Sequence, residues 1–170
     1  VFSSVGDPRI FSRLPQEKVK PALALSLHTT DAELRARLLP RAPRLSPREL
    51  VEAGEAYART TGYPIQLQWT LLAGINDSLE EMAAAADLLQ GKYAILNLIP
   101  YNPTAALDYQ RPSPETIVQL VQHLRQRGIR VAVRQSAGQD VEGGCGQLRA
   151  RLLDGSTQVT KAGARATAHG

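Results

Sequence analysis

Short apolar runs alternate along the chain with segments of helical periodicity. In residues 65–71, apolar and polar side chains alternate, which is the two-residue period of a strand. Residues 22–28 and 93–100 are nearly continuous apolar runs, as expected for strands covered on both faces. Residues 129–134 predict a last strand, and residues 1–2 have the character of the end of a first one.

Four amphipathic segments lie between these runs, and each begins at a residue that can cap a helix. We expect helices at 30–39, 46–62, 78–91 and 113–128, capped by Thr30, Ser46, Ser78 and Ser113. After each of the first three caps, Glu follows at the spacing of a capping box. Because strands alternate with helices, the sequence predicts an α/β fold with a parallel sheet and right-handed crossovers.

Polar side chains follow the predicted strands. In parallel α/β folds, the loops after the carboxyl ends of the strands carry the site. These positions hold Ser3, Ser26, His28, Asn102 and Arg134. We therefore expect a shared pocket at this edge of the sheet. Asn76 and Asp77 also follow a strand, but we interpret them as turn residues that lead to the Ser78 cap, and we expect Trp69 in the core.

The only cysteine, Cys145, lies in a glycine-rich segment after the last predicted strand. A cysteine that serves packing usually lies within an apolar run. Cys145 instead follows Gly143 and Gly144 and precedes Gly146, a backbone that lets another group approach closely. This setting favours a thiol that is presented to a reaction partner, although a lone cysteine can also be structural. A thiolate is a strong nucleophile.

Composition narrows the class of protein. The 170 residues suffice for one domain, and the net charge of +4 is compatible with an acidic partner such as RNA without requiring one. A single cysteine excludes an intrachain disulfide and fits a reducing compartment, so we expect a cytoplasmic protein. No apolar run approaches the roughly 20 residues that span a bilayer, so we expect no membrane partner.

Both ends of the chain carry a signal of their own. The sequence begins at Val1 without an initiator Met, at what resembles the end of a strand, so we expect an N-terminal truncation. Residues 153–170 are small and polar and are expected to form a disordered tail after a domain of residues 1–152.

Five motifs, in this order and spacing, resemble the RlmN/Cfr family of radical S-adenosylmethionine (SAM) enzymes, which methylate adenine in RNA. They are FSSVG at 2–6, LALSLH at 23–28, LLAGIND at 71–77, LNLIPYN at 96–102 and GGCGQLR at 143–149. The resemblance covers residues 1–152. It implies a partial (β/α) barrel of the radical SAM type with its N-terminal half missing, acting as a monomer.

The resemblance also implies roles for individual residues. By its motifs, SAM would be contacted by Ser3, Ser26, the backbone of Leu27, His28 and Asn102. Cys145 matches the cysteine that accepts a methyl group from one SAM. In the family, a second SAM is reduced at a [4Fe-4S] cluster by an electron donor, and the resulting radical activates that methyl group for addition to adenine.

The chain also departs from the family pattern. It has no CxxxCxxC motif for the cluster, no second cysteine for product release and no Gly-Glu pair for the SAM amino group. All three lie upstream of the matched region in the family. We therefore expect no metal site in this chain and no radical chemistry from the chain alone.

Arginines lie in two groups. Arg130, Arg134, Arg149 and Arg151 flank the cysteine segment and are the candidates for RNA contact. Arg35, Arg37, Arg41 and Arg44 are interpreted as a solvated surface, although Arg41 and Arg44, in a proline-rich loop, could touch phosphate.

Two other classes of protein remain open from the sequence. One is a fragment of an unrelated (β/α) barrel enzyme acting on a small metabolite, which predicts no RNA affinity. The other is a non-catalytic RNA-binding remnant, which predicts salt-dependent RNA binding without methylation. The resemblance implies an adenine C2-methyltransferase that acts on ribosomal or transfer RNA. The residues themselves do not distinguish methylation at C2 from methylation at C8, or one RNA from the other.

Overall fold

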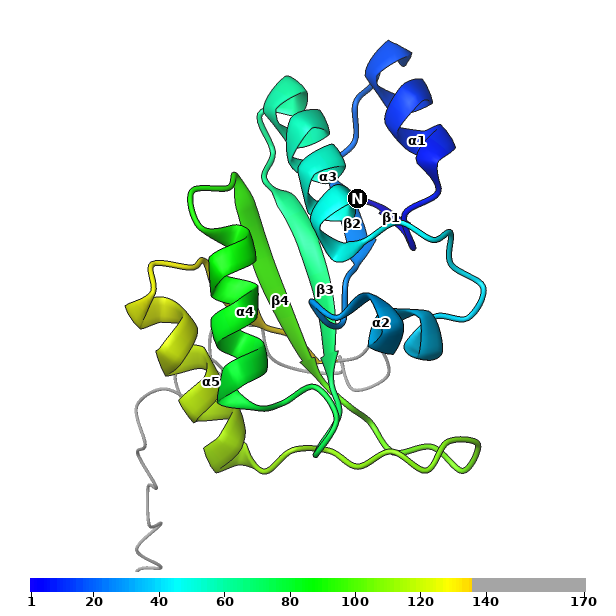
Figure 1. Ribbon diagram of the computed structural model, residues 1–170. Helices are drawn as coiled ribbons and strands as arrows, with labels where there is room; N and C mark the ends of the chain where they lie inside the picture. Colours follow the sequence, from blue (N-terminus) through cyan, green and yellow to red (C-terminus); the bar gives the residue numbers. More distant parts are fainter. Residues whose placement is uncertain (136–170) are drawn as a thin grey trace, which may run out of the picture.

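The computed structural model describes residues 1–135 (Figure 1). Five parallel strands form one sheet in the order β1-β2-β3-β4-β5. They are β1 (Phe2–Ser4), β2 (Leu23–Ser26), β3 (Ile65–Leu71), β4 (Ala94–Pro100) and β5 (Val131–Val133). Each strand therefore pairs with the strand next to it in sequence, which confirms the predicted α/β fold with a parallel sheet.

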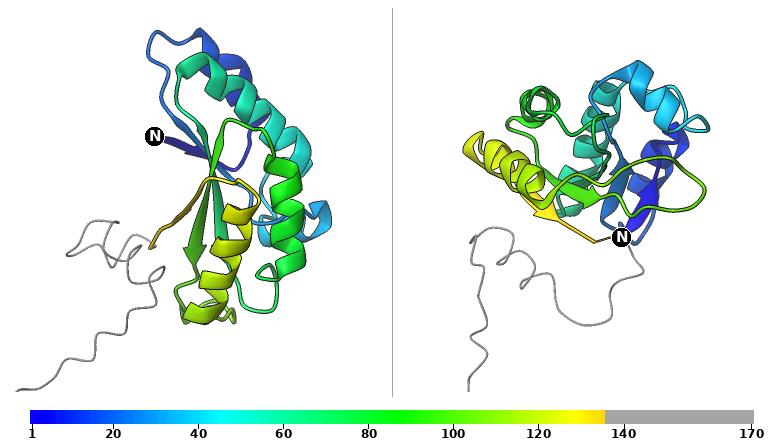
Figure 2. Two further views of the ribbon diagram at one scale, coloured as in Figure 1. Left: turned by 90° about the vertical axis from the view of Figure 1, so that its left-hand side faces the viewer. Right: turned by 90° about the horizontal axis from the view of Figure 1, so that it is seen from below.

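Helices connect the strands and lie on one side of the sheet (Figure 2). They are α1 (Pro8–Arg13), continued by the 3₁₀ turn Leu14–Gln16, then α2 (Ala32–Leu38), α3 (Pro47–Thr61), α4 (Leu79–Leu89) and α5 (Pro114–Gln126). The four predicted helices are all present. The hydrophobic pattern does not predict helix α1, because the helix has only six residues and none of them is fully buried.

Two of the three predicted capping boxes are wrong in detail. Helix α2 is capped by Asp31, whose carboxylate accepts the Leu34 N–H at 2.7 Å, and not by Thr30. At α4, Ser78 accepts the Glu81 N–H at 3.1 Å, but the Glu81 carboxylate accepts from the hydroxyl of Thr29 instead of completing the box. Only the box at Ser46 forms in full.

The two faces of the sheet differ in chemistry. Trp69 and its neighbours at alternate positions of β3 are fully buried under the helices, which confirms Trp69 as a core residue. The intervening side chains point to the opposite face, which no helix of residues 1–135 covers. There the register aligns Ser26 with Gln68 and Gln68 with Asn97. The face away from the helices therefore carries these polar groups, with Ile95 and Ile99 of β4 beside them.

Among the helices of residues 1–135, none combines the length and the apolar character that a membrane-spanning segment requires.

Candidate functional site

The chain leaves strand β2 through an unusual backbone conformation at His28. This is the one non-glycine residue of the described part with a positive φ, at 61°. The N–H groups of Leu27 and His28 both donate to the Gln68 carbonyl, at 2.9 and 3.2 Å. The His28 ring folds back onto β3, and its Nδ1 accepts the Thr70 N–H at 2.9 Å.

This ring replaces a backbone partner. In a regular parallel ladder, the Thr70 N–H would donate to the carbonyl of Leu27. Because Nδ1 of His28 takes that hydrogen bond, the Leu27 carbonyl is left without its ladder partner at the carboxyl edge of the sheet. No group of residues 1–135 donates to this carbonyl instead, so it can accept a hydrogen bond from a ligand N–H group.

His28 is held in its neutral form. Burial lowers its pKa to about 4, and the positive charge of Arg35 acts in the same direction. A neutral ring is required by the contact with Thr70, since Nδ1 can accept a hydrogen bond only without a proton.

The free energy of unfolding should therefore rise with pH between about 4 and 6.5. In this window the unfolded chain binds a proton at residue 28 and the folded chain does not, and the lowered pKa corresponds to about 3 kcal/mol. Urea unfolding at several pH values measures it. His28→Asn removes the titrating group and tolerates a positive φ, so its stability should depend less on pH. An equal pH dependence in both proteins would contradict the assignment.

Asn76 ties this edge together. Its side chain is fully buried; Oδ1 accepts the Leu72 N–H, and Nδ2 donates to the carbonyls of His28 and Thr70, all at 2.8 Å. Its own carbonyl accepts from the Trp69 indole at 3.2 Å. The turn interpretation is confirmed for Asp77, which accepts the Gly74 N–H at 2.8 Å. For Asn76 it is incomplete, because the amide also fixes the backbone of His28.

The interpretation of Arg35 as part of a solvated surface is wrong. The residue is only 3% exposed. Its Nη2 donates to the carbonyl of Val5 at 2.8 Å and to that of Ser26 at 2.7 Å. One guanidinium therefore joins the loop after β1 to the end of β2. The loop is tight at Gly6, where φ is 99° and an added Cβ would lie 2.5 Å from Leu50 Cδ1.

The hydrophobic pattern of the sequence does not predict a polar network that lies on the uncovered face of the sheet. Asn97 lies within the apolar run of β4, yet it is fully buried, and its Nδ2 donates to Gln66 Oε1 at 3.3 Å. Its Oδ1 accepts from Arg134 Nε at 3.0 Å. The guanidinium of Arg134 is thereby anchored at the end of β5, although Arg134 is exposed, as is Arg130 just before the strand.

The remaining site residues lie on neighbouring strands or in the loop after β4. Ser3 is exposed on β1 and pairs with Ala24 of β2, two residues before Ser26, so both serines lie on the uncovered face. Asn102 is exposed just beyond β4. A cavity of about 170 Å³ opens beside it, lined by His28, Thr70, Tyr101, Tyr109 and four leucines, and the two tyrosine rings meet edge to face.

Cys145, Arg149, Arg151 and the tail 153–170 lie outside the described residues, so their predicted roles stay predictions.

The chain fits the two cofactors that the resemblance implies, a [4Fe-4S] cluster and SAM, to different extents. Residues 1–135 contain no group of three His, Cys, Asp or Glu side chains that could hold a metal ion, and the chain has a single cysteine. The ligands present therefore do not fit a [4Fe-4S] cluster. The freed Leu27 carbonyl, the Ser3 and Ser26 hydroxyls and the Asn102 amide do offer the donors and acceptors that an adenosyl amino acid such as SAM requires.

Comparison with solved structures places the fold among radical SAM proteins. The chain is similar to a radical SAM methyltransferase from Sphaerobacter thermophilus, with a TM-score of 0.75 and 39% identity over 85% of this chain and 42% of that one. A domain of a pyruvate-formate lyase-activating enzyme from Bacteroides vulgatus shares the fold at a TM-score of 0.61 and 18% identity.

Curated relatives are more similar in sequence. A probable RNA methyltransferase of Dechloromonas aromatica is 69% identical over 92% of this chain and 44% of its own length. One of Pseudomonas aeruginosa is 65% identical over 93% of this chain and 46% of its own length. No protein-family model matches the chain. The chain thus spans less than half the length of these relatives.

Proposed function

We propose that this chain forms the SAM- and RNA-handling part of a radical SAM RNA methyltransferase of the RlmN/Cfr type. The observation that carries the proposal is the carboxyl edge around His28, where the histidine ring takes over a ladder hydrogen bond and releases the Leu27 carbonyl. The relatives, which are named probable RNA methyltransferases, supply the class of substrate.

The SAM site would be built from the loops after β1, β2 and β4. The Leu27 carbonyl would accept from a ligand N–H group, and Ser3, Ser26 and Asn102 would contact the polar groups of SAM. His28 would support the site indirectly, because its Nδ1 accepts the Thr70 N–H and keeps that group from the Leu27 carbonyl. Arg35 would hold the two serine-bearing segments in register through the carbonyls of Val5 and Ser26. When bound, SAM would supply the methyl group and, with a cluster held outside this chain, the radical.

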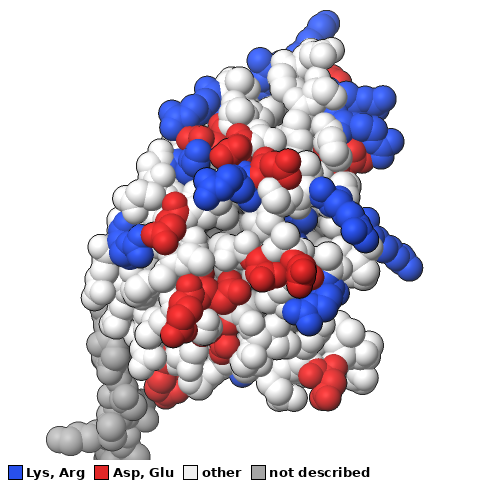
Figure 3. Space-filling view, in the orientation of Figure 1, with Lys and Arg blue, Asp and Glu red and all other residues white. Residues whose placement is uncertain are grey.

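The thiol of Cys145 would carry the methyl group to the RNA base, with adenine C2 as its acceptor. RNA would be bound by Arg130, Arg134, Arg149 and Arg151. On the helix-covered face, Lys and Arg alternate with Asp and Glu, so this face offers no continuous basic surface (Figure 3). RNA contact is therefore proposed at the carboxyl edge and the uncovered face, in a monomeric cytoplasmic protein supplied with electrons by a donor.

A hybrid protein tests this proposal. It consists of the Dechloromonas aromatica relative in which this chain replaces the matching 44% of the sequence. Ser26→Ala and Asn102→Ala should each weaken SAM binding about 10-fold, because each removes one hydrogen bond to the ligand, worth about 1.4 kcal/mol. Isothermal titration calorimetry measures the binding.

Ser12→Ala serves as the matched control, because Ser12 lies on α1 and its hydroxyl donates only to the local Arg9 carbonyl. It should leave SAM affinity unchanged, and all three variants should melt like the parent. Unchanged SAM affinity in both Ser26→Ala and Asn102→Ala would refute the proposed site.

A further inference from the structure

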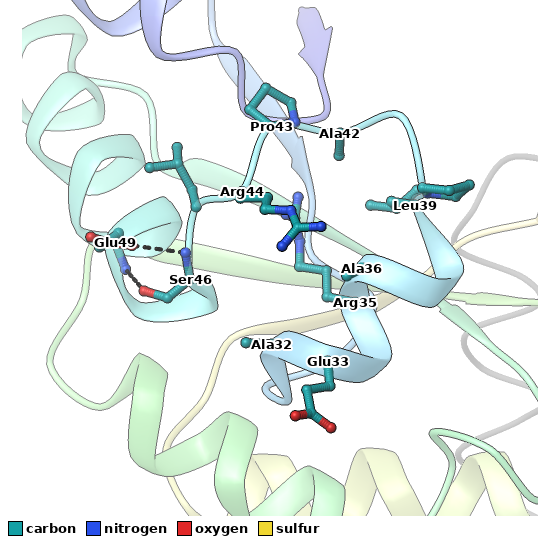
Figure 4. A pocket seen from close by; sticks show the side chains of 12 residues that line it. Ala32, Glu33, Arg35, Ala36, Leu39, Ala42, Pro43, Arg44, Ser46 and Glu49 are labelled. Carbon is teal, nitrogen blue, oxygen red and sulfur yellow. Dashed lines mark hydrogen bonds between the residues drawn. The ribbon is translucent and has the colours of Figure 1, made fainter.

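A second cavity, of about 600 Å³, lies between α2 and the beginning of α3 (Figure 4). Its lining includes Arg35 of α2, Arg44 of the connecting segment, and Ser46 and Glu49 of the first turn of α3. It adjoins the carboxyl edge of the sheet, because Arg35 also contacts the Ser26 carbonyl. Its volume lies in the range of pockets that hold small ligands or parts of larger ones.

Arg35 brings an uncompensated charge to this cavity. Only 3% of Arg35 is exposed, and its Nη2 donates only to carbonyl oxygens. Its Nε has no hydrogen-bond partner among the described residues. None of the ion pairs of residues 1–135 includes Arg35. Buried arginines are normally paired with an anion, and none of residues 1–135 supplies one for Arg35.

Two further features favour an anion in the same place. The Arg44 side chain projects into the cavity toward Arg35 (Figure 4). The cavity also opens at the positive end of α3, a helix of 15 residues.

Two carboxylates oppose this field. That of Glu49 is engaged by the Ser46 N–H at 2.8 Å and offsets part of the helix charge. That of Glu33 points away from the two guanidinium groups (Figure 4). Two arginines therefore remain to meet an anion.

We infer that this cavity binds a backbone phosphate of the RNA, an inference that rests on the proposed RNA substrate. A phosphodiester carries one negative charge and accepts several hydrogen bonds, which suits a pair of guanidinium groups. Because the cavity adjoins the proposed SAM site, the phosphate would belong to a nucleotide near the one that is methylated. Arg35 would then donate a hydrogen bond to the Ser26 carbonyl and also bind the RNA phosphate.

Binding of a fluorescent single-stranded oligoribonucleotide to the full chain tests this site by anisotropy. Arg44→Gln should weaken binding about 5- to 10-fold and lower the slope of log affinity against log salt by about 0.7, the value for one lost contact to a single strand. Arg41→Gln is the matched control, since Arg41 is exposed in the same segment but does not line the cavity. It should change the affinity less than about 2-fold. Neither arginine forms a hydrogen bond within residues 1–135, so both variants should keep the fold, unlike variants of Arg35.

Each other outcome contradicts the site. Equal effects of the two variants would show nonspecific attraction, and absence of RNA binding would remove the ligand. Inorganic phosphate at matched ionic strength is a second probe. Half-displacement of RNA by micromolar phosphate would assign the cavity to the free anion instead. If the cavity test succeeds while the hybrid protein fails to methylate RNA, only the proposed catalytic function is refuted; equal effects of Arg41 and Arg44 refute only this site.

Discussion

Replacing Asn76 by Ala should lower the free energy of unfolding by about 3 to 6 kcal/mol. The side chain is fully buried, and its removal leaves the Leu72 N–H and the carbonyls of His28 and Thr70 without partners. Each unsatisfied buried group costs about 1–3 kcal/mol, and water enters such a site poorly. A loss of this size is a large part of the stability of a small domain.

Urea unfolding of the chain measures this loss. Asn102→Ala is the control, because Asn102 is exposed and should change the stability by less than about 0.5 kcal/mol. Asn76→Asp separates the roles of the two amide atoms, since it keeps an acceptor for Leu72 but places a carboxylate against two carbonyls. A cost below about 1 kcal/mol for Asn76→Ala would show that the amide does not hold this edge together.

Replacing Cys145 by Ala in the hybrid protein should abolish RNA methylation. The proposed route requires a sulfur atom that first accepts the methyl group and then delivers it, and Ala has no nucleophile at this position. The melting temperature should stay close to that of the parent, because removal of one small side chain from a glycine-rich segment creates at most a small cavity. Transfer of radioactive methyl from SAM to RNA is the assay.

The result distinguishes chemistry from packing. A structural thiol would show the opposite pattern, with a lower melting temperature and continuing methylation. Cys145→Ser is a conservative companion, since the hydroxyl preserves size and polarity but is far less nucleophilic than a thiolate near neutral pH. It should be as inactive as the Ala variant.

The main elements of the fold could be predicted because their signals are local. The alternation in β3 and the caps Ser46 and Ser113 lie within a few residues of the elements they define. The predicted cap of α2 fails by one position, since Thr30 and Asp31 are both residues that cap helices well. The hydroxyl of Thr29 accepts the Asp31 N–H at 3.0 Å, which favours Asp31.

The buried polar contacts could not be predicted, because their partners lie far apart in the sequence. Arg35 stands in a charged helix and suggests a solvated surface, but its partners come from Val5 and Ser26, in two other segments. Asn97 is concealed in an apolar run, and Gln66 and Arg134 meet it only when β3, β4 and β5 are side by side. A charge or amide in an otherwise apolar or helical pattern is the one signal that could have marked either residue.

The predicted SAM residues are brought to one edge of the sheet only in part. Ser3 and Ser26 lie on adjacent strands and His28 follows directly, whereas Asn102 lies in an exposed loop after β4. The motif match and the sheet topology agree on the edge. The structure adds that Nδ1 of His28 accepts the Thr70 N–H. Contact of His28 and of the Leu27 backbone with SAM stays a prediction.

The mass of the Cys145 peptide tests the central claim most directly. The hybrid protein is purified with its cluster and SAM, digested with trypsin and analysed by mass spectrometry. We expect the peptide that contains Cys145 to be one methyl group heavier, with fragment ions that place the methyl on sulfur, and the modification to disappear when the peptide carries Cys145→Ala. An unmodified Cys145 in a hybrid protein that still methylates RNA would contradict the account.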